Sequence, residues 1–184
     1  MASQRPVVTF DLDGVLCRPP FGMNPGGLRK PGKRRRPTAI VRFVLDHSER
    51  WRYVFRRPMP GSLDGFRATR QFADCIVLTA RGEVARTTTE RWFARYLGEV
   101  PRIVMRPDLR EPSPEFKRRR AAELGAAAHL EDDPNTAALI AETTPVLLVD
   151  WPRNAGMEGK NVTRVGGVAE AVKLLRTLLI EERP

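Results

Sequence analysis

The fold of this chain is decided by the stretch Val7-Val8-Thr9-Phe10-Asp11-Leu12-Asp13-Gly14-Val15-Leu16, in which an apolar strand runs into two aspartates and a glycine. Asp11 and Asp13 are separated by one residue, so their carboxylates can face one ligand. Two close carboxylates repel each other unless a cation or a shared proton lies between them. The stretch therefore predicts a strand that ends at a hard divalent cation, and a metal-assisted reaction at that point.

Two other uses of this stretch fit its residues poorly. A calcium loop of the EF-hand type requires an oxygen ligand at its fifth position and a glycine at its sixth, whereas here Val15 is fifth and Gly14 is fourth. A surface turn with two solvated aspartates would suit a hairpin, but no second alternating strand follows. The EF-hand interpretation is excluded and the surface turn is disfavoured.

Length and composition are those of one soluble globular domain with a modest insertion. The chain has 184 residues, of which 41% are hydrophobic. Its apolar runs fall short of the ~20 residues that cross a membrane, and its N-terminus lacks a signal-peptide pattern. Cys17 and Cys75 have neither metal-ligand spacing nor a disulfide framework, which fits a reducing compartment. These features predict a cytoplasmic protein.

The net charge of +10 comes from one segment. Residues 18–60 contain 12 Lys or Arg and 2 Asp or Glu, whereas the other 20 basic and 20 acidic residues cancel. The same segment holds seven of the 16 prolines and a basic run at residues 29–36 that no regular core element would contain. We therefore expect a neutral core at residues 1–16 and 61–184, interrupted by a basic, Pro- and Gly-rich insertion at residues 17–60.

Beyond the insertion, apolar residues follow the alternating periods of strands and helices. Ser113 and Pro114 suit the N-cap and the first position of one helix. This alternation predicts an α/β fold with a Rossmann-like, mainly parallel sheet covered by helices on both faces. The expected helices are residues 61–74, 84–98, 113–125, 135–142 and 168–180, and the expected strands after the first are residues 75–78, 103–105, 127–130, 146–149 and 162–165.

Ligands of such sheets bind beyond the carboxyl ends of the strands, so polar residues are expected there. They occur in the sequence at Asp11, at Thr79, around Lys117 in the helix after the third strand, at residues 131–133 and at Asp150. The sequence therefore predicts one site, assembled from several strand ends.

Four motifs at these positions occur in the order seen in the haloacid dehalogenase (HAD) superfamily of phosphotransferases, which this chain resembles. The motifs are Asp11-Leu12-Asp13-Gly14-Val15, Leu78-Thr79-Ala80-Arg81, Lys117 and Leu130-Glu131-Asp132-Asp133, and together they span all of the chain except the insertion. The resemblance implies a HAD core, a magnesium ion and a phosphoaspartyl intermediate. It also implies that the insertion is a small cap near the phosphate site.

The resemblance assigns catalytic roles to the two aspartates, and the chemistry of phosphate esters agrees. The attacking and leaving oxygens are both anionic, so the site has to neutralise charge and align the nucleophile. Asp11 resembles the nucleophile, which splits the reaction into two easier steps. Asp13 resembles the general acid that protonates the leaving alcohol and later activates water. Asp13 also distinguishes the phosphatases from superfamily members that lack it, which favours phosphate hydrolysis over dehalogenation.

By the same resemblance, magnesium is held by Asp11, by the backbone carbonyl of Asp13 and by an acidic residue of the fourth motif. Three adjacent acids leave the register of that motif open. We favour Asp132 as the direct ligand, Glu131 as a ligand through water and Asp133 as the cap of the following helix.

The transferred phosphoryl group is expected at Thr79, Ala80 and Lys117. Thr79 ends a buried strand, where its hydroxyl and the following backbone amides can bind phosphate. Lys117 adds an ammonium group to the positive end of its helix, although it begins a run of four bases of which most are solvated. His129, next to a strand end, is expected to be structural.

Candidates for contacts with the rest of the substrate are Arg81, Arg153 and Asn154. Each has a structural alternative, namely a surface ion pair or a turn of the chain. In the insertion, residues 40–45 suggest a helix, and aromatic residues mix with arginines at residues 50–57. Aromatic stacking combined with arginine charge suits a nucleotide or a nucleic-acid end. Packing of these aromatics against the core is equally compatible with the sequence.

The function expected from these features is that of a magnesium-dependent phosphomonoester hydrolase resembling the 5'-nucleotidase-like HAD proteins, acting on a nucleotide or another small phosphorylated metabolite. A polynucleotide end phosphatase and a non-catalytic, HAD-derived nucleic-acid-binding protein are the alternatives. Residues 27–33 also resemble the Gly-rich loop of nucleotide kinases, but Arg34 replaces the required Ser or Thr and no strand precedes the loop. A nucleotide kinase is therefore disfavoured.

Overall fold

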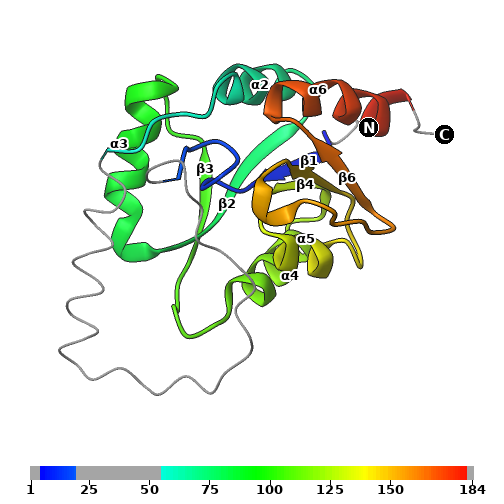
Figure 1. The fold of residues 1–184 in the computed structure, drawn as a ribbon. Helices are drawn as coiled ribbons and strands as arrows, with labels where there is room; N and C mark the ends of the chain where they lie inside the picture. The colour runs from blue at the N-terminus through cyan, green and yellow to red at the C-terminus, as the bar shows by residue number, and fades with distance from the viewer. Residues whose placement is uncertain (1–4, 20–54, 182–184) are drawn as a thin grey trace.

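A computed structural model describes residues 5–19 and 55–181. Its centre is a six-stranded parallel sheet in the order β3-β2-β1-β4-β5-β6 (Figure 1). The α/β fold expected from the sequence is confirmed. In chain order the elements are β1 (Val7–Phe10), α2 (Ser62–Thr69), β2 (Asp74–Gly82), α3 (Arg86–Tyr96), β3 (Arg102–Arg106), α4 (Ser113–Glu123), β4 (Ala126–Glu131), α5 (Pro134–Ile140), β5 (Val146–Val149), β6 (Val162–Val165) and α6 (Val168–Arg176).

Helices cover both faces of the sheet, with α2 and α6 on one side and α4 and α5 on the other (Figure 1). Side chains of a strand alternate between these faces. Val77 of β2 therefore joins the core that includes Phe66 and Phe93, whereas its neighbours Ile76 and Leu78 join the core on the α4 and α5 side. Both layers exclude water from the sheet, which is why the strands read as short apolar runs.

The topology places two distant parts of the sequence side by side. β1 pairs in parallel with β4, with Phe10 opposite Leu130, and the backbone N–H of Asp11 donates to the carbonyl of Leu130 at 2.9 Å. β1 also pairs with β2, with Phe10 opposite Val77. The residues that follow these strands therefore meet at one edge of the sheet.

The expected helix at residues 61–74 is wrong beyond Thr69. The Thr69 hydroxyl donates to the carbonyl of Gly65 at 2.9 Å, and the chain then turns through residues 70–73. The backbone N–H of Asp74 donates to the carbonyl of Pro6 at 2.8 Å, which starts the pairing of β2 beside β1. Phe72, an expected helical residue, packs against the core from this turn.

β2 also extends further than the expected strand. It runs to Gly82, but its register with β3 shifts between Thr79 and Gly82. Regular pairing thus ends at Thr79, the residue expected at the strand end, while the pairing of Gly82 with Arg106 continues the strand beyond this irregularity.

Other boundaries differ at helix ends. α4 begins at Ser113 itself, with Pro112 in the N-cap position and no side-chain cap, so the expected cap at Ser113 is wrong by one residue. The cap at Asp133 is confirmed, because its carboxylate accepts the Thr136 backbone N–H at 2.9 Å. α6 ends at Arg176, and a π-helical turn, Thr177–Glu181, follows it. None of the helices in the two described ranges is long and apolar enough to cross a membrane.

The two ends of the expected insertion lie side by side. The backbone N–H of Arg18 donates to the carbonyl of Arg57 at 2.8 Å, and that of Met59 donates to the carbonyl of Leu16 at 2.9 Å. The chain thus returns to the point where it departs, as an insertion requires. The division at residues 17–60 stays a prediction, and the expected helix at residues 40–45 and the basic run at residues 29–36 lie outside the described residues.

The close approach of α2 to α6 generates a stability prediction. A Cβ atom on Gly65 would lie 2.9 Å from the backbone carbon and oxygen of Val168, and backbone cannot move aside as a flexible side chain can. We expect Gly65→Ala to lower the free energy of unfolding by about 1–3 kcal/mol, measured by urea denaturation. Gly167→Ala is the control, since a Cβ there meets nothing within 4 Å and we expect a change below about 0.5 kcal/mol. Equal stabilities of the two variants would contradict this packing.

Candidate active site

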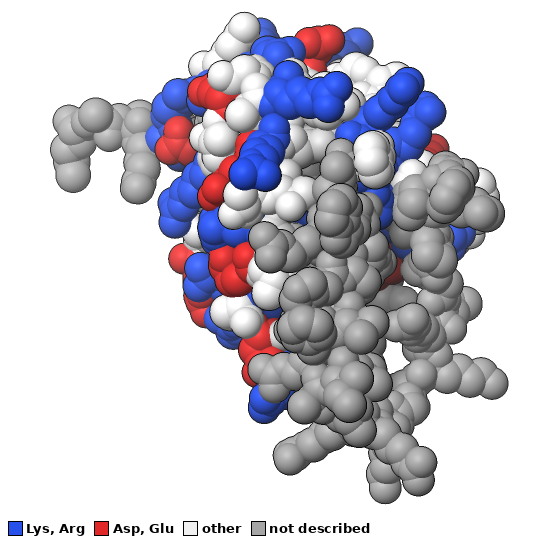
Figure 2. Space-filling view, turned by 90° about the vertical axis from the view of Figure 1, so that its left-hand side faces the viewer, with Lys and Arg blue, Asp and Glu red and all other residues white. Residues whose placement is uncertain are grey.

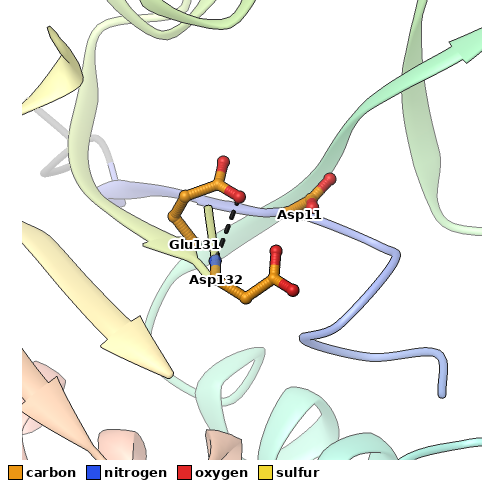
Figure 3. Close-up of side chains that lie close together, drawn as sticks. All are labelled: Asp11, Glu131 and Asp132. Carbon is orange, nitrogen blue, oxygen red and sulfur yellow. Dashed lines mark hydrogen bonds between the residues drawn. The ribbon is translucent and has the colours of Figure 1, made fainter. Parts of the chain in front are cut away.

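Three carboxylates converge where β1 and β4 end. Asp11 follows β1, Glu131 ends β4 and Asp132 follows it, and one oxygen from each lies within 4.8 Å of the others. All three residues are at most 5% exposed. Figure 3 shows the carboxylates of Asp11 and Asp132 on the same side of the strand ends, while the Glu131 carboxylate turns back to accept the Asp132 backbone N–H. We call these residues the acidic trio.

Lys117 is the buried cation of this site. Its Nζ lies 2.8 Å from Oδ1 of Asp11 and 2.7 Å from Oε2 of Glu131. The neighbouring Phe116 is fully buried in the core and anchors the first turn of α4, which directs Lys117 toward the strand ends. Burial opposes its charge, but Asp11 and Glu131 together raise the pKa of Lys117 above its ordinary value. Lys117 therefore lies beside Asp11 and Glu131 and is not one of the solvated bases of its run, whereas its binding of phosphate stays a prediction.

Glu131 is held from several directions. One oxygen accepts the backbone N–H groups of Asp132 and Asp133, and the other lies 2.7 Å from Lys117 Nζ and 3.1 Å from His129 Nε2. Burial disfavours the charge, but Lys117 and His129 outweigh it and hold the pKa of Glu131 below its ordinary range. His129 is itself fully buried, with Nδ1 2.8 Å from the Thr9 hydroxyl. Its contacts agree with the structural role expected for it.

The other two members of the trio are held as anions less firmly. Burial raises the pKa of Asp11 from 3.8 to about 7, although Lys117 acts in the opposite direction. Burial, followed by the charges of Glu131 and Asp11, raises the pKa of Asp132 well above its usual range. Further positive charge between these two carboxylates would relieve their repulsion.

Asp13 lies at the border between this site and solvent. Its side chain is 29% exposed and receives two hydrogen bonds of 2.7 Å from the Nε and Nη2 of Arg81. Nη1 of Arg56 lies 3.5 Å from the same carboxylate. Despite burial, Arg81 and then Arg56 hold the pKa of Asp13 below its ordinary value. The structure thus brings Arg81 to Asp13, and it adds Arg56, which the sequence placed only among the bases of the insertion.

Gly14 makes room for Asp132. Its φ of +94° is a conformation that side chains disfavour, and a Cβ there would lie 1.6 Å from Oδ2 of Asp132. The Gly14 carbonyl accepts the Trp151 indole N–H at 2.9 Å. The glycine after the two aspartates is therefore required by both backbone conformation and space.

The loop after β5 contacts both the carboxylate and the backbone carbonyl of Asp132. Nη2 of Arg153 lies 2.5 Å from Oδ2 of Asp132, and the Asn154 amide donates to the backbone carbonyls of Asp132 and Val149 at 3.0 and 2.8 Å. Asn154 is only 1% exposed, so the structure places it beneath the loop as a positioning group. Asp150, the polar residue at the end of this strand, pairs with Arg164 at 2.6 Å.

Thr79 and Ala80 lie on the strand next to β1. Thr79 comes two residues after Val77, the partner of Phe10, and it is 1% exposed. Its hydroxyl accepts the Arg81 backbone N–H at 3.3 Å. Both residues therefore lie near the strand edge where Asp11 begins the site, and their binding of phosphate stays a prediction.

The donor set suits a hard divalent cation. Asp11 and Asp132 present carboxylate oxygens, which Mg²⁺ prefers, within one small buried cluster. The carboxylates of Asp11 and Asp132 are the two whose pKa values are raised, so a cation between them would lower the cost of their charges. The residues present thus fit the magnesium ion expected from the sequence.

Two structures of known proteins match nearly the whole chain. A haloacid dehalogenase-like family hydrolase from Xanthomonas campestris has a TM-score of 0.60 at 10% identity, and the match covers 97% of this chain and 98% of that one. The chain has the fold of the HAD hydrolases. A HAD-superfamily hydrolase of subfamily IA from Geobacter sulfurreducens PCA gives a TM-score of 0.56 at 15% identity, covering 95% of this chain and 100% of the HAD chain.

A second kind of structural neighbour comes from RNA repair. A chain of the Pnkp1/Rnl/Hen1 RNA repair complex matches with a TM-score of 0.58 at 18% identity, over 82% of this chain and 44% of its own length. Another structure of the same complex gives a TM-score of 0.55, over 48% of that chain. The present chain therefore spans less than half the length of these neighbours. No protein-family model and no curated protein matches it.

The raised pKa of Asp11 predicts a dependence of stability on pH. Because its folded pKa of about 7 exceeds the ordinary value of 3.8, the folded chain binds more protons than the unfolded chain between these values, and stability falls as pH rises through that window. Asp11→Asn cannot titrate. In metal-free urea denaturation, we expect the free energy of unfolding of the wild type to fall between about pH 5 and about pH 8 by at least about 1 kcal/mol more than that of this variant.

Asp74→Asn is the matched control for this measurement. Its carboxylate is 58% exposed on the opposite end of β2 and should leave the pH profile of the wild type unchanged. Parallel profiles for wild type and Asp11→Asn would contradict the electrostatic description of the trio.

Proposed function

We propose that this chain is a magnesium-dependent phosphomonoester hydrolase that works through a phosphoaspartyl intermediate on Asp11. The observation that carries the proposal is the burial of Asp11 at the end of β1, against Lys117 and beside Asp132. A buried carboxylate with a fixed cation on one oxygen and a second carboxylate close enough to share a metal ion is suited to attack a charged phosphoryl group. The proposed substrate is a nucleotide or another small phosphorylated metabolite, as for the 5'-nucleotidase-like HAD proteins.

The two aspartates divide the chemistry. An oxygen of Asp11 attacks the phosphorus atom, and the leaving alcohol takes a proton from Asp13. Asp13 then removes a proton from water, which attacks the phosphorus of the acyl phosphate and releases inorganic phosphate with restored Asp11. Arg81 and Arg56 fix the Asp13 carboxylate at the solvent border of the site and hold its pKa below its ordinary value, so the acid step requires Asp13 to take up a proton when substrate binds.

The remaining residues balance charge and hold the phosphoryl group. Asp11, Asp132 and the backbone carbonyl of Asp13 would hold the magnesium ion directly, and Glu131 would act through a water molecule. The bound ion supplies positive charge to the oxygens of the transferred group. Lys117 supplies a second positive charge at Oδ1 of Asp11.

The phosphate oxygens are assigned to the Thr79 hydroxyl and the backbone amide of Ala80, with Lys117. Arg81 and Arg153 border the site and are the proposed contacts to the rest of the substrate, whereas Asn154 acts through the loop that it holds.

A polynucleotide end phosphatase is the second candidate. The neighbours from the Pnkp1/Rnl/Hen1 RNA repair complex support it, as does the basic surplus of residues 18–60. Figure 2 shows Lys and Arg side chains, with acidic ones among them, on the side of the molecule that α3 occupies in Figure 1, and α3 itself contributes exposed Arg91 and Arg95. A phosphorylated strand would meet favourable charge there. The third candidate, a HAD-derived protein that binds nucleic acid without turnover, shares this surface.

The proposal is tested by phosphate release from a panel of nucleotides, phosphorylated metabolites and oligonucleotides with 3' or 5' phosphates. We expect turnover that requires Mg²⁺ and stops in EDTA. Asp11→Asn should lower kcat by at least about 10³-fold, because it removes the nucleophile. Asp13→Asn should lower kcat as well. Asp64→Asn, whose carboxylate is 85% exposed on α2, should retain wild-type activity.

The outcomes separate the three functions. Turnover of small monoesters supports the leading proposal, and turnover confined to oligonucleotide ends, with steep salt dependence, supports the second candidate. Salt-dependent oligonucleotide binding without phosphate release, unchanged in Asp11→Asn, would show a non-catalytic binding protein and refute both enzyme assignments.

A further inference from the structure

Arg153 contacts the metal-ligand candidate Asp132 from outside the trio. Its Nη2 lies 2.5 Å from Oδ2 of Asp132, and its side chain is 12% exposed while that of Asp132 is 2% exposed. Arg153 belongs to a short 3-10 turn, Pro152–Asn154, that follows β5. A guanidinium so placed partly offsets burial and two neighbouring anions, which together still raise the pKa of Asp132.

The backbone of Asp132 is held by other contacts. Its backbone N–H donates to Glu131 at 3.0 Å and its carbonyl accepts the Asn154 amide at 3.0 Å. Gly14 leaves the space that the Asp132 carboxylate fills. Arg153 is therefore not the group that holds the Asp132 backbone, and what it adds at the carboxylate is positive charge.

Arg153 also has a second anion within reach. Its Nη1 lies 3.9 Å from Oδ2 of Asp133, whose other oxygen caps α5, and the Asp133 side chain is 26% exposed. Lys117 differs, because it is enclosed at 4% exposure between two carboxylates. Of these two cations beside the trio, Arg153 is the more exposed, and it has an ionic partner outside the trio.

We propose that Arg153 competes with the divalent cation for Asp132, so that cation binding exchanges one counter-ion for another. The guanidinium neutralises Asp132 before the cation arrives and moves toward Asp133 when it binds. Arg153 thus sets the cation affinity and adds one mobile positive charge at the edge of the loaded site. This inference rests on the magnesium site of the proposed function, but its test does not use activity.

The test is a calorimetric titration of the full chain with MgCl₂, repeated with MnCl₂. Arg153→Gln removes the competing charge, and we expect it to bind the cation about tenfold more tightly than wild type. Arg153→Lys keeps the charge and should stay within about twofold of wild type. Arg164→Gln is the matched control, since Arg164 pairs with Asp150 and donates to the Asn154 carbonyl at 2.5 Å in the same loop. It too should stay within about twofold.

Equal or weaker binding by Arg153→Gln would overturn the inference and leave the magnesium site intact. Absence of binding in the wild type and in every variant would instead refute the magnesium site, and the inference with it. Should Arg153→Gln fail to fold, wild-type chain labelled with ¹⁵N-arginine decides. The Arg153 Nε–Hε signal, assigned by its loss in Arg153→Lys, has to shift with Mg²⁺ at the same concentrations as cation binding, and an unmoved signal overturns the inference.

Discussion

The structure depends on the confinement of like charges where two parallel strands end. Asp11, Glu131 and Asp132 are nearly inaccessible to water and lie within a few ångströms of one another. Such a cluster is costly to bury unless positive charge is built in beside it. Lys117 supplies that charge from one side and Arg153 from the other. The segments around the strand ends are arranged so that these two cations lie beside the cluster.

The supporting contacts come from segments far apart in the chain. α4 delivers Lys117, and the loop after β5 delivers Arg153 together with the indole that donates to the Gly14 carbonyl. The chain returning from the expected insertion delivers Arg56 to Asp13, and the Arg56 backbone carbonyl accepts the Trp92 indole N–H at 2.8 Å. The segment that leaves the core is thereby joined both to the candidate acid and base and to α3. Arg56 thus contributes both a positive charge beside Asp13 and a hydrogen bond that holds α3.

The sequence predicted the parts of this arrangement that depend on local pattern. Short apolar runs predicted the strands, because a sheet covered on both faces needs them, and parallel pairing then required Asp11 and the acids at residues 131–133 to meet. The cap at Asp133 was predictable from the proline that follows it. The helix expected at residues 61–74 failed because its apolar residues continue through a turn in which Phe72 still packs against the core.

The ionic partners were beyond prediction because they are set by tertiary structure. Nothing near Arg56, Arg81 or Arg153 in the sequence indicates which carboxylate each will meet. The positions of Arg81 and Arg153 after strands indicate contacts to substrate rather than ion pairs with Asp13 and Asp132. The sequence groups Arg56 only with the bases of the expected insertion. The burial of Lys117 amid a run of solvated bases is likewise decided by the packing of α4.

The central claim is that Asp11 and Asp132 share one divalent cation, with Asp11 as the acceptor of the phosphoryl group. Anomalous diffraction from a crystal soaked with MnCl₂ and beryllium fluoride, which imitates a phosphoryl group on a carboxylate, tests it most directly. We expect a manganese peak between the Asp11 and Asp132 carboxylates and beryllium fluoride bonded through its beryllium atom to an oxygen of Asp11. A manganese peak remote from both residues, with beryllium fluoride on another side chain, would contradict the shared cation site and the role of Asp11.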